Sequence, residues 1–225
     1  SNPTGPSIPP AEHDAICAWA REHGAWRIVD EIYLDLADSD AQGRPPRSVL
    51  AVDDGAIVVN SFSKYFGMTG WRLGWCVVPA ELAPAMERLA QNYYICPSTL
   101  AQHAALACFS AESLALCEGR RAGFSQRRQQ VLAGLARIGL PVPVAPDGAF
   151  YVYIDVSGTG LEASRFCELA LEQAHVALSP GRDFGHCSAD THARLSYAAA
   201  PEELAEGIAR LGHFLDRLQD GSLPR

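Results

Sequence analysis

The chain has 225 residues, of which 48% are hydrophobic, 20% charged and 8% aromatic, enough to build a core in one or two domains. This composition excludes disordered and fibrous proteins, and no apolar run approaches the roughly 18 to 20 residues that cross a bilayer, so no membrane span is expected. The formal net charge of −8 at pH 7 has the wrong sign for a surface that binds nucleic acid or anionic lipid, and we expect neither as a partner.

The cysteines and the N-terminal residues provide evidence on the cellular compartment and on targeting. The seven cysteines are odd in number and show no C-x-x-C spacing, so we expect reduced thiols and a cytoplasmic protein. The N-terminus does not resemble a secretory signal, and we expect no targeting segment. Residues 1–10 are rich in Asn, Pro, Gly and Ser, which is typical of a connection between elements. We therefore expect that the numbering begins inside a longer protein or that the chain is a truncated product.

The first half of the chain alternates helices with strands. Apolar residues at helical spacing predict helices over 11–23 and 80–91. Short apolar runs predict strands at 26–30, 56–59 and 71–78. The run at 56–59 lacks alternation, which is typical of a strand covered on both faces. This order favours an α/β fold with a mostly parallel sheet.

The second half has the pattern of a smaller α+β unit. One or two long helices follow Pro97 and end at Gly139. We place the domain boundary within these helices, between residues 118 and 119. The elements expected after them are a strand at 149–156, a helix at 162–174, short strands near 176 and at 193–197, and a terminal helix at 201–218.

Residues 60–74, NSFSKYFGMTGWRLG, carry the clearest chemical signal. Ligands of open α/β sheets bind where strands end, and Lys64 follows a predicted strand. A partly desolvated lysine is a nucleophile that attacks carbonyl groups and forms a Schiff base. Ser61, Ser63 and Arg72 are residue types that bind phosphate. Together these residues indicate a site for a phosphorylated aldehyde, although Lys64 taken alone also fits an ordinary solvated loop lysine.

Three upstream residues fit the same ligand. Asp30 ends the predicted strand WRIVD, where a carboxylate is either solvated or paired with a cation such as a protonated pyridine nitrogen. Tyr33, in DEIY, has a hydroxyl that suits a phenolate oxygen, while packing at a strand exit is an equally good explanation. Asn2, in NPTG, fits a turn residue when taken alone.

The motifs NPTG, DEIY and SFSKYFGMTGWRLG, in this order, resemble those of the aminotransferase class I and II family of fold-type-I pyridoxal-phosphate (PLP) enzymes. The resemblance covers essentially the whole chain. It implies the C-terminal part of a mostly parallel-sheet, PLP-binding large domain at residues 1–118 and a small α+β C-terminal domain at residues 119–225. It further implies a homodimeric aminotransferase that transfers an amino group between an amino acid and a 2-oxo acid through a Schiff base on Lys64.

The resemblance also gives each candidate residue on the cofactor side a role. Lys64 resembles the catalytic lysine, which holds PLP as a Schiff base and later shuttles a proton. Asp30 resembles the partner of the pyridine nitrogen. Asn2 and Tyr33 resemble the pair that hydrogen-bonds the phenolic oxygen of the cofactor.

The remaining roles concern anionic groups. Ser61, Ser63 and Arg72 resemble the residues that bind the cofactor phosphate. Arg194, in ARLSYAA, resembles the arginine that binds the α-carboxylate of the substrate.

Other polar residues are expected to be structural. His186 and Cys187 are neighbours whose side chains point apart on an extended segment, and no further ligands are spaced to complete a site, so no metal is expected. Arg182 and Asp183 are expected to be structural or solvated. A basic run on a predicted helix is expected to form a solvated face; it consists of Arg120, Arg121, Arg127 and Arg128.

The resemblance reaches only the C-terminal part of such enzymes. In the family, residues before NPTG supply a ring that stacks on the pyridine and a phosphate-binding loop. We therefore assign the activity to a longer protein and do not expect it to require that this chain is active by itself. Three alternatives stay open. They are a PLP-dependent carbon–sulfur lyase, the aminotransferase-like sensory domain of a bacterial transcription regulator, and a non-catalytic remnant that dimerises.

Overall fold

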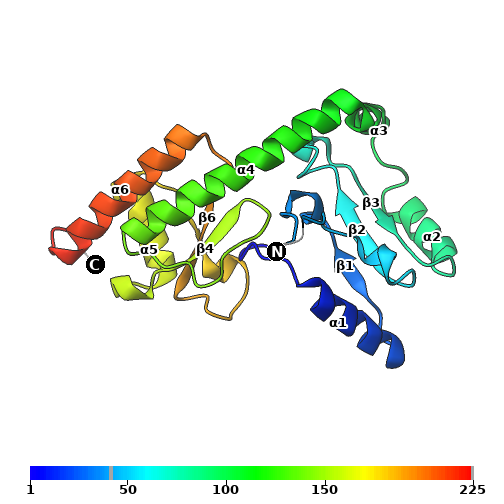
Figure 1. Ribbon diagram of the computed structural model, residues 1–225, viewed down its shortest axis with the longest axis horizontal. Helices are drawn as coiled ribbons and strands as arrows, with labels where there is room; N and C mark the ends of the chain where they lie inside the picture. Colours follow the sequence, from blue (N-terminus) through cyan, green and yellow to red (C-terminus); the bar gives the residue numbers. More distant parts are fainter. Residues whose placement is uncertain (41–42, 224–225) are drawn as a thin grey trace. The chain divides into compact units, whose positions relative to one another are not determined.

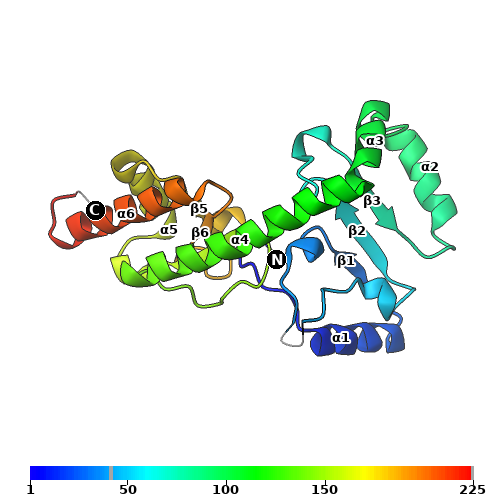
Figure 2. The same ribbon diagram turned by 45° about the horizontal axis from the view of Figure 1, so that its top comes forward.

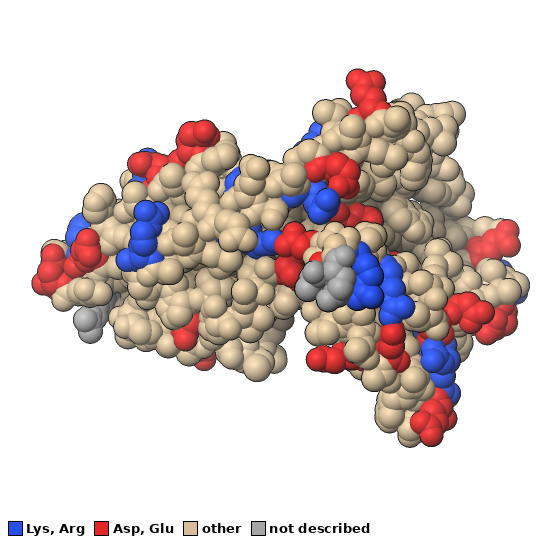
Figure 3. Space-filling view, viewed as in Figure 1, with Lys and Arg blue, Asp and Glu red and all other residues tan. Residues whose placement is uncertain are grey.

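The computed structural model describes residues 1–40 and 43–223, which form two compact units. The N-terminal unit is Ile8–Arg121, and the C-terminal unit combines Ser1–Ser7 with Ala122–Arg225. The predicted division between large and small domains after residue 118 concerns the whole protein and stays a prediction. On the face shown in Figure 3, acidic and basic side chains are interspersed over the described residues.

The N-terminal unit contains a three-stranded sheet in the order β1-β2-β3 (Figure 1), formed by Ile28–Asp30, Ile57–Ser61 and Gly74–Val77. β1 and β2 are parallel, as expected, but β2 and β3 are antiparallel. The expectation of a mostly parallel sheet is therefore wrong for the described residues. A parallel connection needs a crossover, usually a helix, whereas residues 62–73 form turns and the 3-10 helix Thr69–Trp71.

The helices of this unit are α1 (Pro10–Glu22), α2 (Ala83–Tyr93) and α3 (Thr99–Leu106), with shorter 3-10 helices at Leu34–Leu36, Val49–Ala51 and Ala107–Phe109. Pro10 opens α1 at a position where a helix does not need the missing N–H. Cys17 of α1 is buried in a cluster with Val49, Ala56 and Val58. α1 therefore covers one face of the β1–β2 pair.

The other face of β2 is not covered in the same way. Val58 is 2% exposed, whereas Val59, which points to the opposite face, is 41% exposed. The expectation that the run 56–59 is buried on both faces is therefore wrong for the described residues. The run is apolar on both sides, but only the side of Val58 packs against α1 and its neighbours.

The C-terminal unit contains an antiparallel sheet in the order β4-β6-β5, formed by Tyr151–Asp155, His192–Ser196 and Ser179–Pro180. Its helices are α5 (Ala163–Leu169), which continues as the π-helix Ala170–Ala174, and α6 (Pro201–Gln219). The strand expected near Val176 is wrong, because the Val176 amide donates to Ala170 O at 3.1 Å and ends the helix. The strand begins later, at Ser179.

Helix α4 (Ala111–Arg137) begins in the N-terminal unit and ends in the C-terminal unit. In the C-terminal unit it lies beside α6, as both Figure 1 and Figure 2 show, and a Cβ on Gly134 would lie 2.7 Å from Ile208 Cδ1. Glycine at this position therefore allows the two helices to approach closely.

The prediction that the arginines of α4 form a solvated face is wrong for Arg128. Arg128 is only 4% exposed, and its Nη2 donates to Ser125 Oγ at 3.3 Å. The reason is helical spacing: Val131 and Leu135, three and seven residues later, lie on the same side of α4 and belong to the main core. The arginine stem therefore turns toward the core instead of toward water.

In the part of the chain that the structure describes, no single helix is long and apolar enough to cross a bilayer, and only Thr99–Phe109 and Ala111–Arg137, with an 81° bend between them, meet the requirements as a pair.

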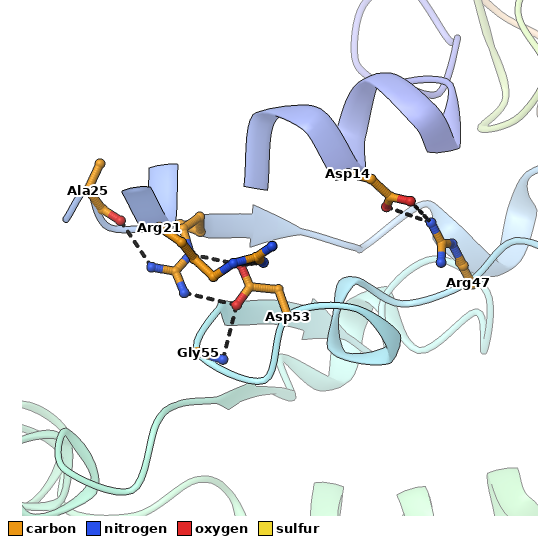
Figure 4. Close-up of polar contacts among 7 residues, drawn as sticks. Asp14, Arg21, Ala25, Arg47, Asp53 and Gly55 are labelled. Atoms are coloured by element: carbon orange, nitrogen blue, oxygen red, sulfur yellow. Dashed lines mark hydrogen bonds and ion pairs between the residues drawn. The ribbon is translucent and has the colours of Figure 1, made fainter. Parts of the chain in front are cut away.

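Asp53 connects α1, β1 and β2 (Figure 4). Arg27, just before β1, donates through Nε to Asp53 Oδ2 and through Nη2 to Asp53 Oδ1, both at 2.9 Å. Arg21 of α1 approaches Oδ2 at 3.1 Å, and the Gly55 amide donates to Oδ1 at 3.2 Å. The Asp53 side chain is 1% exposed, so this carboxylate is buried and paired. Because Arg27 leads into β1 and Asp53 into β2, the pair fixes the start of both strands.

Replacing Asp53 with asparagine should destabilise the protein, because the guanidinium groups of Arg27 and Arg21 would lose a buried carboxylate partner. We expect the free energy of unfolding to fall by about 3 kcal/mol in urea denaturation at pH 7. The control is Asp14→Asn, which removes a similar pair with Arg47 in which both side chains are 43% exposed (Figure 4). Its cost should stay below about 1 kcal/mol, and equal losses would contradict a special role for the buried pair.

Asp53 should also make the free energy of unfolding depend on pH. The hydrogen bonds and positive charge of Arg27 hold the pKa of Asp53 below its usual range. A carboxyl group with a lowered folded-state pKa stabilises the fold above its unfolded pKa of about 4, and that contribution is lost as the pH falls through the folded pKa. The stability difference between the unaltered chain and Asp53→Asn should therefore be constant from about pH 7 to about pH 5 and shrink below about pH 4.

Candidate active site

The parallel pairing of β1 and β2 brings two candidate residues to one edge of the sheet. Asp30, the last residue of β1, is in register with Val59 of β2, and Ser61 ends β2 two residues later. Lys64 follows after two further residues. The carboxyl ends of parallel strands form the edge at which open α/β sheets bind ligands. The N-terminal unit thus presents the carboxylate and the lysine segment at the same edge.

The backbone around Lys64 is held by its own loop. Lys64 O accepts from the Gly67 amide at 3.1 Å, which closes a turn over Lys64–Gly67. The Thr69 hydroxyl donates to Ser63 O at 2.6 Å, and the Met68 amide donates to Phe62 O at 3.0 Å. The loop therefore has a defined shape, anchored by the buried side chains of Phe62 and Met68.

The Lys64 side chain lies near Tyr33. Its ammonium nitrogen is 5.7 Å from the centre of the Tyr33 ring, within the range of a cation–π contact. Lys64 is also the only lysine among the 225 residues. Any lysine chemistry of this chain therefore belongs to Lys64.

Ser61 and Ser63 are neighbours in space. The Ser61 hydroxyl lies 2.8 Å from Ser63 Oγ and 3.1 Å from Leu73 O, and it accepts from the Ser63 amide at 3.0 Å. A hydroxyl has one proton and donates to one acceptor at a time. Ser63 is buried, so its hydroxyl serves the loop, whereas Ser61 is only partly buried at the end of β2.

Arg72 and Asp30 are exposed and have local partners. Arg72 has a left-handed backbone, with φ of 54° and ψ of 51°, and its Nη1 donates to Thr69 O at 2.8 Å. A non-glycine residue pays steric strain in this conformation, which is found disproportionately at functional sites. Asp30 Oδ1 accepts from the Ile32 amide at 3.0 Å. The next residue, Glu31, is buried and accepts from the Val49 amide at 2.7 Å, a structural role that the sequence analysis did not identify.

The C-terminal unit contains the other two candidates, Asn2 and Arg194. Arg194 lies in β6, the central strand, in register with Ser179 of β5 and with Tyr153 of β4. Its Nη1 donates to Asn2 Oδ1 at 2.8 Å, and its Nη2 donates to Ser179 Oγ at 3.1 Å. Asn2 and Arg194, which are far apart in the sequence, are therefore direct partners.

Two aromatic rings lie close to the Arg194 guanidinium. Its central carbon lies 4.4 Å from the centre of the Tyr151 ring and 4.6 Å from that of Phe184. Arg194 Nε is buried and has no hydrogen-bond partner among the described residues. A buried N–H without an acceptor is costly, and a planar carboxylate is the natural acceptor for an arginine edge. Neither Tyr151 nor Phe184 is among the residues that the sequence motifs single out, because this contact joins residues far apart in the sequence.

Arg182 has a structural role, as expected. Arg182 pairs with Asp190 at 2.8 Å and with Glu162 at 3.2 Å. All seven cysteines are described, and none of them is in a disulfide there. Within the described residues there is also no group of three or more His, Cys, Asp or Glu side chains arranged to hold a metal ion.

Comparisons with known proteins point to one family. The family model for aminotransferase class I and II matches residues 1–211. A curated relative from Mycobacterium tuberculosis, named valine–pyruvate aminotransferase, is 41% identical over 96% of this chain and 55% of the relative. A second, from Streptomyces avermitilis, named aspartate aminotransferase, is 37% identical over 98% of this chain and 55% of the relative. The chain thus spans about 55% of the length of these relatives.

Solved structures agree with the sequence comparisons. A crystal structure of an aminotransferase from Mycobacterium tuberculosis superposes with a TM-score of 0.90 at 41% identity, covering 96% of this chain and 55% of the other. An aromatic aminotransferase from Pyrococcus horikoshii gives a TM-score of 0.88 at 35% identity, covering 97% of this chain and 58% of the other. The mixed α/β architecture is that of these enzymes. The chain belongs to the aminotransferase class I and II family.

Proposed function

We propose that this chain forms the C-terminal part of a PLP-dependent aminotransferase, with residues 1–118 belonging to the cofactor-binding large domain and residues 119–225 forming the small C-terminal domain. The order of the motifs, the family match over residues 1–211 and the 55% coverage of the relatives support this assignment. The substrates are an amino acid and a 2-oxo acid. The relatives are named for valine, aspartate and aromatic amino acids, so the side chain of the amino acid is left unassigned.

The observation that carries this proposal is the shared edge of β1 and β2. Asp30 ends β1, and Ser61 and Lys64 follow the parallel neighbour β2. Tyr33 lies beside Lys64. An amine, a carboxylate, a phenol and a hydroxyl are thus grouped in the N-terminal unit.

The chemistry of these side chains fits PLP, the cofactor of class I and II aminotransferases. PLP has an aldehyde, a phosphate, a phenolic oxygen and a basic ring nitrogen. Lys64 has an amine, which can condense with the aldehyde. The Ser61 hydroxyl and the Arg72 guanidinium can bind the phosphate. Asp30 suits a protonated ring nitrogen, and the Tyr33 hydroxyl suits a phenolic oxygen. The residues present therefore fit the cofactor.

When bound, PLP supplies an electron sink that stabilises negative charge at the α-carbon of the substrate. Asp30 keeps a proton on the ring nitrogen, because a carboxylate next to that nitrogen favours its charged form. Tyr33 orients the phenolic oxygen through its hydroxyl. Lys64 would be the attachment point for the cofactor. Once the amine of the substrate has displaced it, the free amine of Lys64 would take a proton from the α-carbon, and the resulting ammonium would return one.

Anionic groups are bound at two places. Ser61 and Arg72 bind the cofactor phosphate, and Ser63 supports Ser61 through the contact between their hydroxyls. In the C-terminal unit, Arg194 binds the substrate carboxylate. Its Nε supports this role, because it is buried and has no hydrogen-bond partner in the described part of the chain. Asn2 and Ser179 fix the plane of the guanidinium by accepting from Nη1 and Nη2.

The proposal includes a homodimer in the cytoplasm. The dimer is inferred from the family. Several apolar residues on and after α2 are exposed and could be covered by a second subunit; they include Tyr93, Ile95 and Leu100. The cytoplasmic assignment is supported by the thiols, since none of the seven cysteines is in a disulfide in the described residues.

Lys64 should carry the cofactor. Incubation with PLP followed by borohydride should add the reduced cofactor to Lys64, as located by peptide mass mapping. Lys64→Ala should abolish this label and lower transamination by at least roughly 10³-fold in the full-length protein. A label on another residue with none on Lys64 would contradict the assignment.

The acceptor requirement separates transamination from elimination. A transaminase needs a 2-oxo acid to complete its cycle, so omitting the 2-oxo acid should stop turnover after one half-reaction. Release of pyruvate and ammonia without an acceptor would instead identify a carbon–sulfur lyase.

Arg72 should show a conflict between stability and cofactor binding. Glycine adopts a left-handed backbone without strain and alanine does not, so Arg72→Gly should be more stable than Arg72→Ala by about 1 kcal/mol in urea denaturation. Both variants lack the guanidinium and should bind PLP at least roughly tenfold more weakly. Unchanged PLP affinity would remove Arg72 from the phosphate site, whatever the stabilities are.

Arg194 should act on the substrate and not on the cofactor. Arg194→Lys keeps the charge but loses the planar pair of donors, so kcat/KM should fall by roughly 10²-fold for both the amino acid and the 2-oxo acid. Borohydride labelling of Lys64 should be unchanged. Arg182→Lys, at an exposed arginine of the same unit, is the control, and an equal loss there would argue against a specific role for Arg194.

A further inference from the structure

Tyr65, the residue after Lys64, hydrogen-bonds to helix α4. Its hydroxyl donates to Glu118 Oε1 at 2.7 Å, a length typical of a charge-assisted hydrogen bond. Tyr65 is the second residue of the Lys64–Gly67 turn, which the Gly67 amide closes onto Lys64 O. The hydrogen bond therefore connects the turn that begins at Lys64 to a residue 53 positions away in the sequence.

A second contact ties the same turn to the same part of α4. Gly67, the last residue of the turn, has a φ of +70° and lies against Arg120, where a Cβ would be 3.0 Å from Nη1. Arg121 holds the Glu118 carboxylate through Nε and Nη2, each 2.9 Å from Oε2. One turn of α4 thus contacts both the second and the fourth residue of the lysine turn.

The protonation of the pair is defined at neutral pH. Burial, followed by the hydrogen bond to Glu118, raises the pKa of Tyr65 above its usual value. The hydrogen bond from Tyr65, assisted by Arg121, lowers the pKa of Glu118. Tyr65 therefore stays the donor and Glu118 the charged acceptor over the range in which an aminotransferase would operate.

We propose that Tyr65 and Glu118 form a positioning pair for Lys64, in which the hydrogen bond docks the Lys64–Gly67 turn on α4 and so holds the lysine side chain ready for the cofactor aldehyde. The inference rests on the proposed function. Neither residue is catalytic, since both act through the backbone of the turn.

The test compares two forms of the cofactor. PLP has an aldehyde that bonds to Lys64, whereas pyridoxamine phosphate has an amine at the same carbon and is held only by contacts to its ring and phosphate. Tyr65→Phe removes the hydroxyl and keeps the ring, which packs edge-on against Phe66 at 5.0 Å. This variant should bind PLP about tenfold more weakly, while its affinity for pyridoxamine phosphate stays within about twofold.

A substitution of Glu118 should weaken PLP binding through the same hydrogen bond as the substitution of Tyr65. Glu118→Gln keeps an acceptor oxygen but loses the charge, so its PLP affinity should fall in the same direction by a smaller factor. The double variant should be no weaker than Tyr65→Phe alone, because both changes remove one interaction. Glu112→Gln, at another glutamate of α4, is the matched control and should leave both affinities unchanged.

Hydrogen exchange tests the docking without the cofactor. In Tyr65→Phe the amides of Gly67 and Met68 should exchange about tenfold faster than in the unaltered chain, because the turn loses its attachment to α4. Unchanged exchange would overturn the docking, and an equal loss of PLP and pyridoxamine phosphate binding would overturn the positioning of Lys64. Failure of the unaltered protein to take PLP onto Lys64 would instead overturn the proposed function.

Discussion

The parallel pairing of β1 with β2 is the constraint on which the N-terminal unit depends. Its register sets Asp30 beside Val59, so that the carboxylate and the lysine segment leave the sheet at one edge. The buried Asp53 carboxylate stabilises that register, because it binds Arg27 immediately before β1 and itself lies in the turn that leads into β2 at Ile57. A change of register would separate Asp30 from Lys64. The ion pair between Arg27 and Asp53 thus helps to place the candidate ligand groups.

The chemistry is divided between the two units. The N-terminal unit groups an amine, a carboxylate, a phenol and phosphate-binding donors, which suit a phosphorylated aldehyde with a basic ring. The C-terminal unit holds Arg194 close to two aromatic rings. Two of its nitrogens are bound to Asn2 and Ser179, and a third is buried with no acceptor among the described residues. The first set would bind the cofactor, and the second would bind the carboxylate that every amino acid and 2-oxo acid shares. Substrate choice among amino acids would then be made by other groups.

Elements with a regular apolar period could be predicted from the sequence. Helix α1 was expected at 11–23 and is Pro10–Glu22, and α6 was expected at 201–218 and is Pro201–Gln219. Strand direction could not be predicted for β3, because the sequence does not show that residues 62–73 return as turns. Burial was misjudged where it depends on a distant partner, as for Val59 and Arg128. The motifs identified candidate residues, but not Ser179, Phe184 or Glu118, because these contacts join residues far apart in the sequence and follow no local pattern. The single lysine is a compositional signal that by itself assigns any lysine chemistry to Lys64.

The central claim is that one edge of this sheet binds PLP through Asp30, Lys64 and Arg72. A crystal structure of the full-length protein soaked with PLP tests it most directly. We expect the ring nitrogen against the Asp30 carboxylate, the former aldehyde carbon bonded to Lys64 Nζ, and the phosphate against Ser61 and Arg72. Electron density for the cofactor at another place, or side chains of Asp30 and Lys64 directed into separate cavities, would contradict it.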